Sequence, residues 1–407
     1  MAGRVNLAVT GVQDQWLTGS PRLSYFVMSY RRHTRFSTEM MEIPLSFNVN
    51  EGKKPSLGNS VTCRIPNNMG DLLRSVALKV TLDPPTDENI YNASIGTRII
   101  EYADLVIGGQ TIERLTGEYI YMYDQLHNNI DDTFQTLYFL TGHNNNIVFS
   151  EPYTFFVNIP FYFFRHPSLA VPICAITKQL VEIRIQFKRK DDNITFSYKN
   201  QVLEPTSGGS IHSASILADF YYVTDDEKNF LRTRPIEYVI TQLQMANVPL
   251  KANEMSRSVM TNFKHPVKEM YFMANVKGNR TVATTNPTLY RSDGVNARSD
   301  VRFIKNISLE FNEAKVFDND RLQLSYQQSL DHHTGCPSPA YEFYTYSFSM
   351  NPEMYYPTGQ VNMSRVRHQK LNLELDEADP EYETHVSVYA VNYNVLHVQS
   401  GLAGLKF

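Results

Sequence analysis

The sequence predicts an all-β protein of two consecutive units, each a sandwich or jelly roll of short strands. Three observations lead to this prediction. Apolar and polar residues alternate in many short segments, which is typical of strands with one buried face. Tyr and Phe are abundant, at 25 and 23 residues, and their side chains favour pleated, half-buried surfaces. A chain of 407 residues is too long for one small sandwich and suits two domains.

The first half of the chain contains several segments with this alternation. Asp83-Pro84-Pro85 ends one of them, because proline has no N–H to donate to a strand ladder. Gly108-Gly109 suits the tight turn of a hairpin, and Thr116 is expected to cap a short helix. The expected strands are residues 43–49, 76–82, 103–107, 155–163, 181–187 and 216–223.

A charged stretch that ends in Pro235 marks the boundary between the two units. Alternation resumes after it, and the expected strands of the second half are residues 238–243, 267–273, 307–311, 341–350, 371–375 and 386–398. Three polar segments rich in turn residues are expected to be long loops: Asn128–Ser150, Lys188–Ser213 and Asn275–Asp300. The predicted organisation is an arm (1–24), a first unit (25–224), a linker (225–235), a second unit (236–398) and a tail (399–407).

The N-terminal segment Gly11–Phe36 combines an apolar run with a basic cluster. It holds the only tryptophan, Trp16, and Gly19-Ser20-Pro21 predicts a chain reversal. The run Leu23–Tyr30 is apolar on both parities, which predicts a strand buried on both faces. The basic cluster consists of Arg31, Arg32, His33 and Arg35. We expect Trp16 and this cluster to form an interaction site, in which the arginines contact another subunit or an inner layer.

Charge and cysteine content exclude several classes of protein. A net charge of −4 gives no basic field for a nucleic-acid backbone, so we expect no direct nucleic-acid binding. Three separated cysteines, Cys63, Cys174 and Cys336, form neither a disulfide framework nor a CxxC zinc motif, which suits a reducing compartment. The N-terminus lacks the apolar core of a signal peptide, and no apolar run spans a bilayer. We expect a soluble protein made in the cytoplasm.

No group of residues predicts catalysis. Asp331-His332-His333 with Cys336 suggests a metal site, but adjacent histidines on a strand face opposite sides, and no second ligand pair has suitable spacing. Gly108-Gly109 lacks the lysine and spacing of a phosphate loop, and no G-x-S-x-G elbow is present. We therefore predict no catalytic residues, no cofactor, no metal and no small-molecule substrate.

Blocks along the whole chain resemble the major capsid proteins of the nucleocytoplasmic large DNA viruses, the double jelly-roll family of iridoviruses and phycodnaviruses. Two departures are mild, Thr358 where the family usually has Ser and Met363 where it usually has Phe. The blocks are residues 13–21 (QDQWLTGSP), 26–36, 95–112, 344–348 (YTYSF), 351–365 and 389–404.

The resemblance implies two consecutive eight-stranded jelly rolls with short helices in loops. It also implies a structural protein of the virion whose homotrimers, pseudo-hexagonal in outline, tile an icosahedral shell after synthesis and assembly in the host cytoplasm. Expected partners are neighbouring capsomers and minor capsid proteins, and contact with an inner viral membrane is left open. The family's amino-terminal arm lies inside the shell, and the three polar loops are candidates for its outer surface.

Three alternatives stay open at this point. A low-copy capsid paralogue would have the same fold. A carbohydrate-binding jelly roll would need an exposed aromatic platform or an acidic calcium loop. A cupin-type enzyme would need a histidine-rich pair of metal-binding strands, which the sequence lacks.

Overall fold

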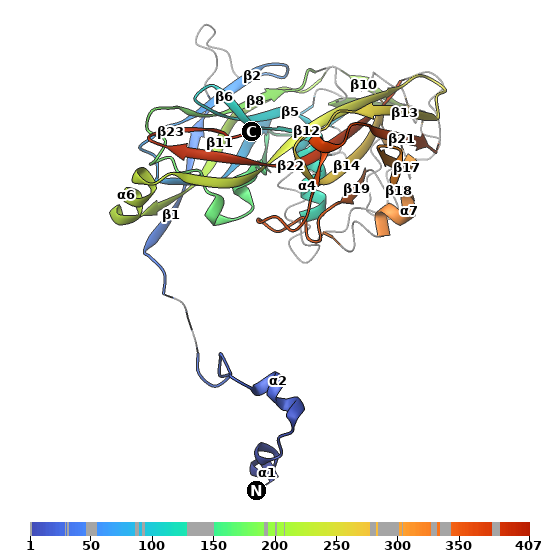
Figure 1. Cartoon of the computed structure of the whole chain (residues 1–407). Coiled ribbons are helices and arrows are strands. Elements are labelled where there is room, and N and C mark those ends of the chain that lie inside the picture. The colour runs from blue at the N-terminus through green and yellow to red at the C-terminus, as the bar shows by residue number, and fades with distance from the viewer. Residues whose placement is uncertain are drawn as a thin grey trace. The chain divides into compact units, whose positions relative to one another are not determined.

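The computed structural model describes the chain except residues 1, 29, 31, 46–54, 86–88, 92–93, 128–149, 191–193, 200–201, 207, 277–281, 284–300, 303, 327–331, 334–342 and 377–382. It contains an N-terminal unit (residues 1–36) and a main unit (residues 37–407), which holds both β-sandwiches (Figure 1). The predicted end of the arm at residue 24 remains a prediction, as do the other predicted boundaries. Among the described residues, no helix is both long and apolar enough to cross a membrane.

The described residues of the N-terminal unit (residues 1–36) form short helices and no strand before Phe36. The helices are α1 (Ala2–Ala8), η1 (Val12–Asp14) and α2 (Gln15–Thr18). The prediction of a buried strand at Leu23–Tyr30 was wrong: its described residues are not extended in a sheet, and Tyr25 is 94% and Phe26 97% exposed. A run that is apolar on both parities forms a buried strand when a layer covers each of its faces.

Roll 1 consists of eight antiparallel strands in two sheets. Their order is β1-β11-β3-β7 in one sheet and β2-β8-β5-β6 in the other. If the eight strands are numbered one to eight along the chain, the order is one, eight, three, six in the first sheet. In the second sheet the order is two, seven, four, five. The strands are β1 (Phe36–Pro44), β2 (Ser60–Ile65), β3 (Leu72–Leu82), β5 (Ile100–Ile107), β6 (Gln110–Thr116), β7 (Tyr153–Asn158), β8 (Val181–Phe187) and β11 (Ile211–Val223).

Local sequence explains several elements of roll 1. The alternating residues Val76, Leu78, Val80 and Leu82 of β3 are at most 1% exposed, as the period of two predicts. Gly108 and Gly109 have positive φ angles of 59° and 84°, and these angles allow the tight turn between β5 and β6. Thr116 caps α4 (Gly117–His127), because its Oγ1 accepts from Tyr119 N–H at 3.2 Å.

Roll 2 has the same spatial order of strands. Its sheets are β12-β22-β14-β19 and β13-β21-β17-β18, again strands one, eight, three and six, then two, seven, four and five. The strands are β12 (Ile236–Leu250), β13 (Ser256–Thr261), β14 (Pro266–Val276), β17 (Ile304–Phe311), β18 (Ala314–Asp320), β19 (Phe343–Ser347), β21 (Gln369–Leu375) and β22 (Thr384–Gln399). The predicted fold, two consecutive eight-stranded jelly rolls, is confirmed.

Shorter elements complete the fold. In roll 2, β16 (Val301–Arg302) and β20 (Val361–Asn362) pair with β14, and β23 (Leu402–Leu405) pairs with β22. The predicted linker contains α6 (Asp225–Thr233), whose first turn carries three acidic residues that suit the positive end of the helix dipole. Further helices among the described residues are α3 (Ile95–Arg98), η2 (Tyr162–Phe164), η3 (Pro167–Leu169), α7 (Arg321–Leu324) and η6 (Met363–Arg365).

A small sheet occupies segments that the sequence predicts to be loops. Within Lys188–Ser213, β9 (Thr195–Lys199) and β10 (Val202–Thr206) form a hairpin. The sheet has the order β15-β10-β9-β4, with β4 (Asn89–Tyr91) and β15 (Val282–Ala283) at its edges. The expectation of a plain loop at 188–213 is therefore corrected. Most of the other two predicted loops, 128–149, 277–281 and 284–300, lies outside the described residues.

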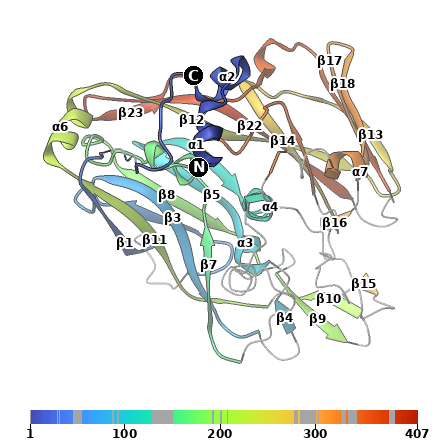
Figure 2. The ribbon, with the colours of Figure 1, turned by 90° about the horizontal axis from the view of Figure 1, so that it is seen from below.

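The apolar core of roll 1 continues into the main sheet of roll 2. Residues of β12, β14, β19 and β22, among them Ile240, Tyr271 and Tyr389, belong to the roll 1 cluster. Alternate residues of β14, such as Met270 and Phe272, belong to the roll 2 cluster, and β12 contributes Val248 and Leu250 to it from its C-terminal end. The sheet therefore has apolar side chains on both faces, as in a layer buried on both sides. Figure 2 shows the strands of roll 1 (blue to green) beside those of roll 2 (yellow to red).

Candidate functional site

Aromatic side chains fill the centre of the contact between the rolls. Tyr119 of α4 lies edge-on to Tyr271 of β14, with ring centroids 5.3 Å apart, and 6.1 Å from the ring of Tyr389 of β22. All three are buried, and burial raises the pKa of each hydroxyl well above its ordinary value. Such aromatic pairs contribute about 0.5–1.5 kcal/mol each beyond the apolar area they bury. This contact fixes roll 1 against roll 2.

Hydrogen bonds cross the same contact. The Tyr389 hydroxyl donates to Glu118 Oε2 at 2.9 Å and accepts from Thr116 Oγ1 at 3.0 Å. Gln242 Nε2 of β12 donates to the carbonyl of Ile112 in β6 at 2.6 Å. Because each bond needs a particular register between the rolls, these bonds select one relative placement.

The C-terminal segment adds a further contact to roll 1. Ala403 N–H, in β23, donates to Gln179 Oε1 at 2.7 Å, and Lys178 N–H donates to the carbonyl of Gly401 at 3.1 Å. The segment predicted to be a tail, residues 399–407, therefore bonds to roll 1 while β23 extends the main sheet of roll 2.

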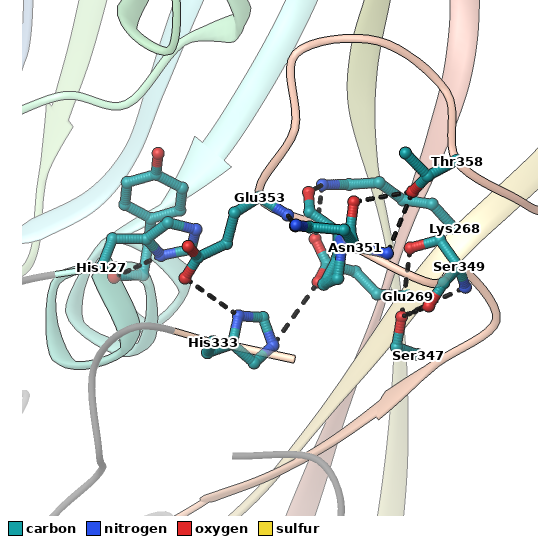
Figure 3. A network of polar contacts seen from close by, with 11 residues as sticks. His127, Lys268, Glu269, His333, Ser347, Ser349, Asn351, Glu353 and Thr358 are labelled. Carbon is teal, nitrogen blue, oxygen red and sulfur yellow. Dashed lines mark hydrogen bonds and ion pairs between the residues drawn. The ribbon is translucent and has the colours of Figure 1, made fainter. Parts of the chain in front are cut away.

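A buried ion pair lies on β14 at the edge of this contact (Figure 3). Lys268 Nζ is 2.8 Å from Glu269 Oε1 and donates to the carbonyl of Pro352 at 2.7 Å. The two residues are consecutive, and a register shift between Val267 and Glu269 interrupts the β14–β22 ladder there. Burial lowers the pKa of Lys268 to about 8. Burial acts to raise the pKa of Glu269, but the charge of Lys268 and neighbouring histidines hold it below its ordinary value.

His127, the last residue of α4, faces this cluster from roll 1. Its Nδ1 lies 2.9 Å from the carbonyl of Tyr123, and since a carbonyl only accepts, Nδ1 carries the proton. The imidazole also stacks on the Tyr123 ring, with centroids 3.8 Å apart. Burial, followed by the effect of His333, lowers the pKa of His127 to about 4. At neutral pH the ring is therefore neutral, with its lone pair on Nε2.

His333 lies between two carboxylates of roll 2. Its side chain is 1% exposed; Nδ1 is 3.7 Å from Glu353 Oε1 and Nε2 is 3.8 Å from Glu269 Oε2. Both separations exceed hydrogen-bond length. Figure 3 shows the Glu353 carboxylate between the rings of His127 and His333. One ligand atom from each of these three residues lies within 4.8 Å of the others.

Hydrogen bonds within the loop hold the segment that carries Glu353. Asn351 Oδ1 accepts from Glu353 N–H at 3.2 Å. Thr358 Oγ1 accepts from Asn351 N–H at 3.1 Å and donates to the Asn351 carbonyl at 2.7 Å. Thr358 is one of the two departures from the resembled pattern, and it keeps the hydroxyl that a serine would provide. Met363, the other departure, is 1% exposed and fills a core position as a phenylalanine would.

The predicted interaction residues belong to the N-terminal unit, residues 1–36. Trp16 is in α2 and is 90% exposed, and Arg32, His33 and Arg35 are exposed. His33 Nδ1 is 2.8 Å from the carbonyl of Thr34, and its ring is 5.8 Å from that of Phe36. Arg31 lies outside the described residues. The predicted role of this cluster stays a prediction.

Sequence reasoning missed the cluster around His333. It weighed His332 and His333 as neighbours on a strand, together with Asp331 and Cys336, which lie outside the described residues. His127 and Glu353 are distant in sequence, and no local motif connects them to His333. The one local signal is that His127 ends the helix that Thr116 was predicted to begin.

Comparisons with known proteins agree along the whole chain. A family model for the N-terminus of major capsid proteins matches residues 24–223, and one for the major capsid protein of large eukaryotic DNA viruses matches residues 227–404. The chain is 28% identical to the major capsid protein of Pyramimonas orientalis virus over 420 aligned residues, covering 100% of this chain and 99% of the relative. It is 25% identical to that of Paramecium bursaria Chlorella virus 1, covering 100% of both.

The fold also matches a solved structure. The crystal structure of VP54 from the same Chlorella virus superposes with a TM-score of 0.76 at 22% identity, covering 94% of this chain and 100% of that chain. This likeness concerns the fold and agrees with the strand order of the two rolls.

Proposed function

The chain belongs to the major capsid proteins of the large eukaryotic DNA viruses, and from this membership we propose that three copies form one capsomer, pseudo-hexagonal in outline. Such capsomers would tile an icosahedral shell. The role is structural and needs no catalytic residue. Its mechanism is the burial of surface between rolls and between subunits, where many repeated contacts add up to a stable shell.

The repeated strand order of the two rolls carries this proposal. Both rolls place strands one, eight, three and six in one sheet and two, seven, four and five in the other. Three copies of a chain with two similar rolls present six similar sides. That symmetry holds only if the rolls keep one relative placement, and the buried contact around Tyr119, Tyr271 and Tyr389 supports this.

We further propose that the N-terminal segment contacts the inner layer of the shell. Trp16, Arg32, His33 and Arg35 are exposed and available for a partner, and Arg31 belongs to the same basic cluster. The partners would be neighbouring capsomers and minor capsid proteins, with an inner viral membrane as a further candidate. The protein would act in the virion after synthesis and assembly in the host cytoplasm.

Electron microscopy of the purified chain tests the proposal. Negatively stained particles are expected to show three lobes with a pseudo-hexagonal outline, and monomers only would contradict it. A second measurement, the number of copies per virion, distinguishes a major capsid protein from a low-copy paralogue of the same fold. A major capsid protein is the most abundant shell component, whereas a paralogue is present in a small fraction of that amount.

A further inference from the structure

We propose that His127, His333 and Glu353 bind one divalent transition-metal ion, best suited to Zn²⁺, that ties roll 1 to roll 2. One ligand atom from each residue lies within 4.8 Å of the others. The donors come from both rolls: His127 ends α4 of roll 1, while His333 and Glu353 lie in roll 2. Two imidazoles and a carboxylate form a donor set that Zn²⁺ uses in proteins, with a fourth position for water.

The strongest evidence is the environment of His333. Its side chain is 1% exposed, and within the described part of the chain neither ring nitrogen has a hydrogen-bond partner. A buried polar atom without a partner is costly and rare, so it needs an explanation. The 3.7 Å between Nδ1 and Glu353 Oε1 is too long for a hydrogen bond. It is close to the roughly 3.4 Å expected between two donors on one tetrahedral zinc ion.

The second nitrogen of His127 is arranged as in known metal sites, and that of His333 faces a carboxylate at a longer distance. Metal-binding histidines usually direct the other ring nitrogen at a carbonyl or carboxylate, which fixes the tautomer and the ring orientation. His127 Nδ1 donates to the Tyr123 carbonyl at 2.9 Å, which leaves Nε2 for the metal. His333 Nε2 faces Glu269 Oε2 at 3.8 Å, which leaves Nδ1 for the metal.

The supporting groups restrict movement of the donors. Glu269 is paired with Lys268 at 2.8 Å, and Glu353 is the carboxylate that shares the 4.8 Å cluster with the two histidines. The hydrogen bonds of Asn351 to Glu353 and Thr358 hold the loop that presents Glu353. A metal bound here would fix the end of α4 against the loops of roll 2. The sequence-based expectation of no metal site weighed His333 only with its chain neighbours.

Metal content measures the site directly. The full-length, tag-free chain is dialysed against a chelator, then against Zn²⁺, and its zinc is measured by mass spectrometry. We expect one Zn²⁺ per chain, and binding at least tenfold weaker in Glu353→Gln and in His333→Ala. The control His397→Ala removes a half-exposed imidazole of β22 outside the cluster and is expected to keep full zinc binding. Added Zn²⁺ should raise the melting temperature of the wild type and not that of Glu353→Gln.

A measurement on the wild type alone tests the site even if the variants do not fold. Co²⁺ added to the chelator-treated chain is expected to give the visible absorption of a four-coordinate nitrogen and oxygen site, which Zn²⁺ then displaces. A correctly folded wild type that takes up neither Zn²⁺ nor Co²⁺ overturns the proposal. Equal zinc content in the wild type and both site variants also overturns it. These outcomes concern one chain and are independent of whether it forms trimers.

Discussion

Tyr389, on the eighth strand of roll 2, donates its hydroxyl proton to Glu118 of roll 1 across 2.9 Å. The same oxygen accepts from Thr116 of roll 1 at 3.0 Å. One buried oxygen therefore joins the start of α4 to the sheet shared by the two cores. Its bonds require the rolls to keep one relative placement, on which the proposed capsomer depends.

Replacing Tyr389 with Phe tests the strength of this connection. The change removes the hydroxyl and keeps the ring packing against Tyr119. We expect the free energy of unfolding to fall by about 1–3 kcal/mol, because a buried bond to a charged acceptor is lost. Urea unfolding measures it, and Tyr326→Phe, at an exposed tyrosine, serves as the control that leaves the midpoint unchanged. Equal stability of Tyr389→Phe and the wild type would show that the bond does not hold the rolls.

The buried Lys268–Glu269 pair predicts a non-additive result. Lys268→Met leaves the Glu269 charge buried without its 2.8 Å partner, and we expect a loss of about 3–5 kcal/mol. The double variant Lys268→Met with Glu269→Leu should lose much less, since both charges are gone. Lys315→Met breaks the exposed pair with Asp318 and should leave the unfolding midpoint unchanged. Additive losses in the double variant, measured with a chelator present, would contradict this account.

Glu113 predicts a pH-dependent stability. Burial raises its pKa to about 8 from the ordinary 4.5, although Tyr162 N–H and Arg165 act in the opposite direction. Between these pH values the folded chain keeps a proton that the unfolded chain releases. The free energy of unfolding therefore falls as pH rises from about 4.5 to about 8, by at most about 1.4 kcal/mol per unit. Outside this window Glu113 contributes no pH dependence.

Glu113→Gln checks this assignment. Burial of neutral His127 acts in the opposite direction at the acidic end of the window, so the variant is compared with the wild type. We expect the slope of unfolding free energy against pH to be less negative in Glu113→Gln than in the wild type across the window, while Glu101→Gln, at an exposed carboxylate, keeps the wild-type slope. A slope that persists unchanged in Glu113→Gln would assign the pH dependence to other groups.

Charge reversal in the basic cluster separates the role of the arm from that of the rolls. Arg32→Glu with Arg35→Glu changes exposed residues outside both cores, so we expect folding and the mass of the oligomer to stay as in the wild type. Assembly of closed shells should be lost, because the inner-layer contact is disrupted. Shells counted by electron microscopy measure this. Normal shell assembly in the double variant would show that the basic cluster does not anchor the subunit to the inner layer.

Local patterns predicted the parts of the fold that depend on local rules. The alternation at Val76–Leu82, the turn at Gly108-Gly109 and the cap at Thr116 each follow from backbone geometry within a few residues. The prediction of a strand at Leu23–Tyr30 was wrong because a strand buried on both faces depends on covering layers from distant segments, which a local pattern does not reveal. The β9–β10 hairpin was missed because the polar, turn-rich residues around it outweighed the short alternation at Phe196 and Tyr198. His127, His333 and Glu353 meet only through the packing of roll against roll, which no local pattern encodes.

The mass of the purified chain in solution tests the central claim most directly. One chain is 46.8 kDa, and we predict a species of about 140 kDa, three chains, by light scattering or native mass spectrometry. Glu118→Gln with Tyr389→Phe, which weakens the placement of the rolls, should lower the share of this species. A wild-type chain that stays at 46.8 kDa at the concentrations used for assembly would contradict the account.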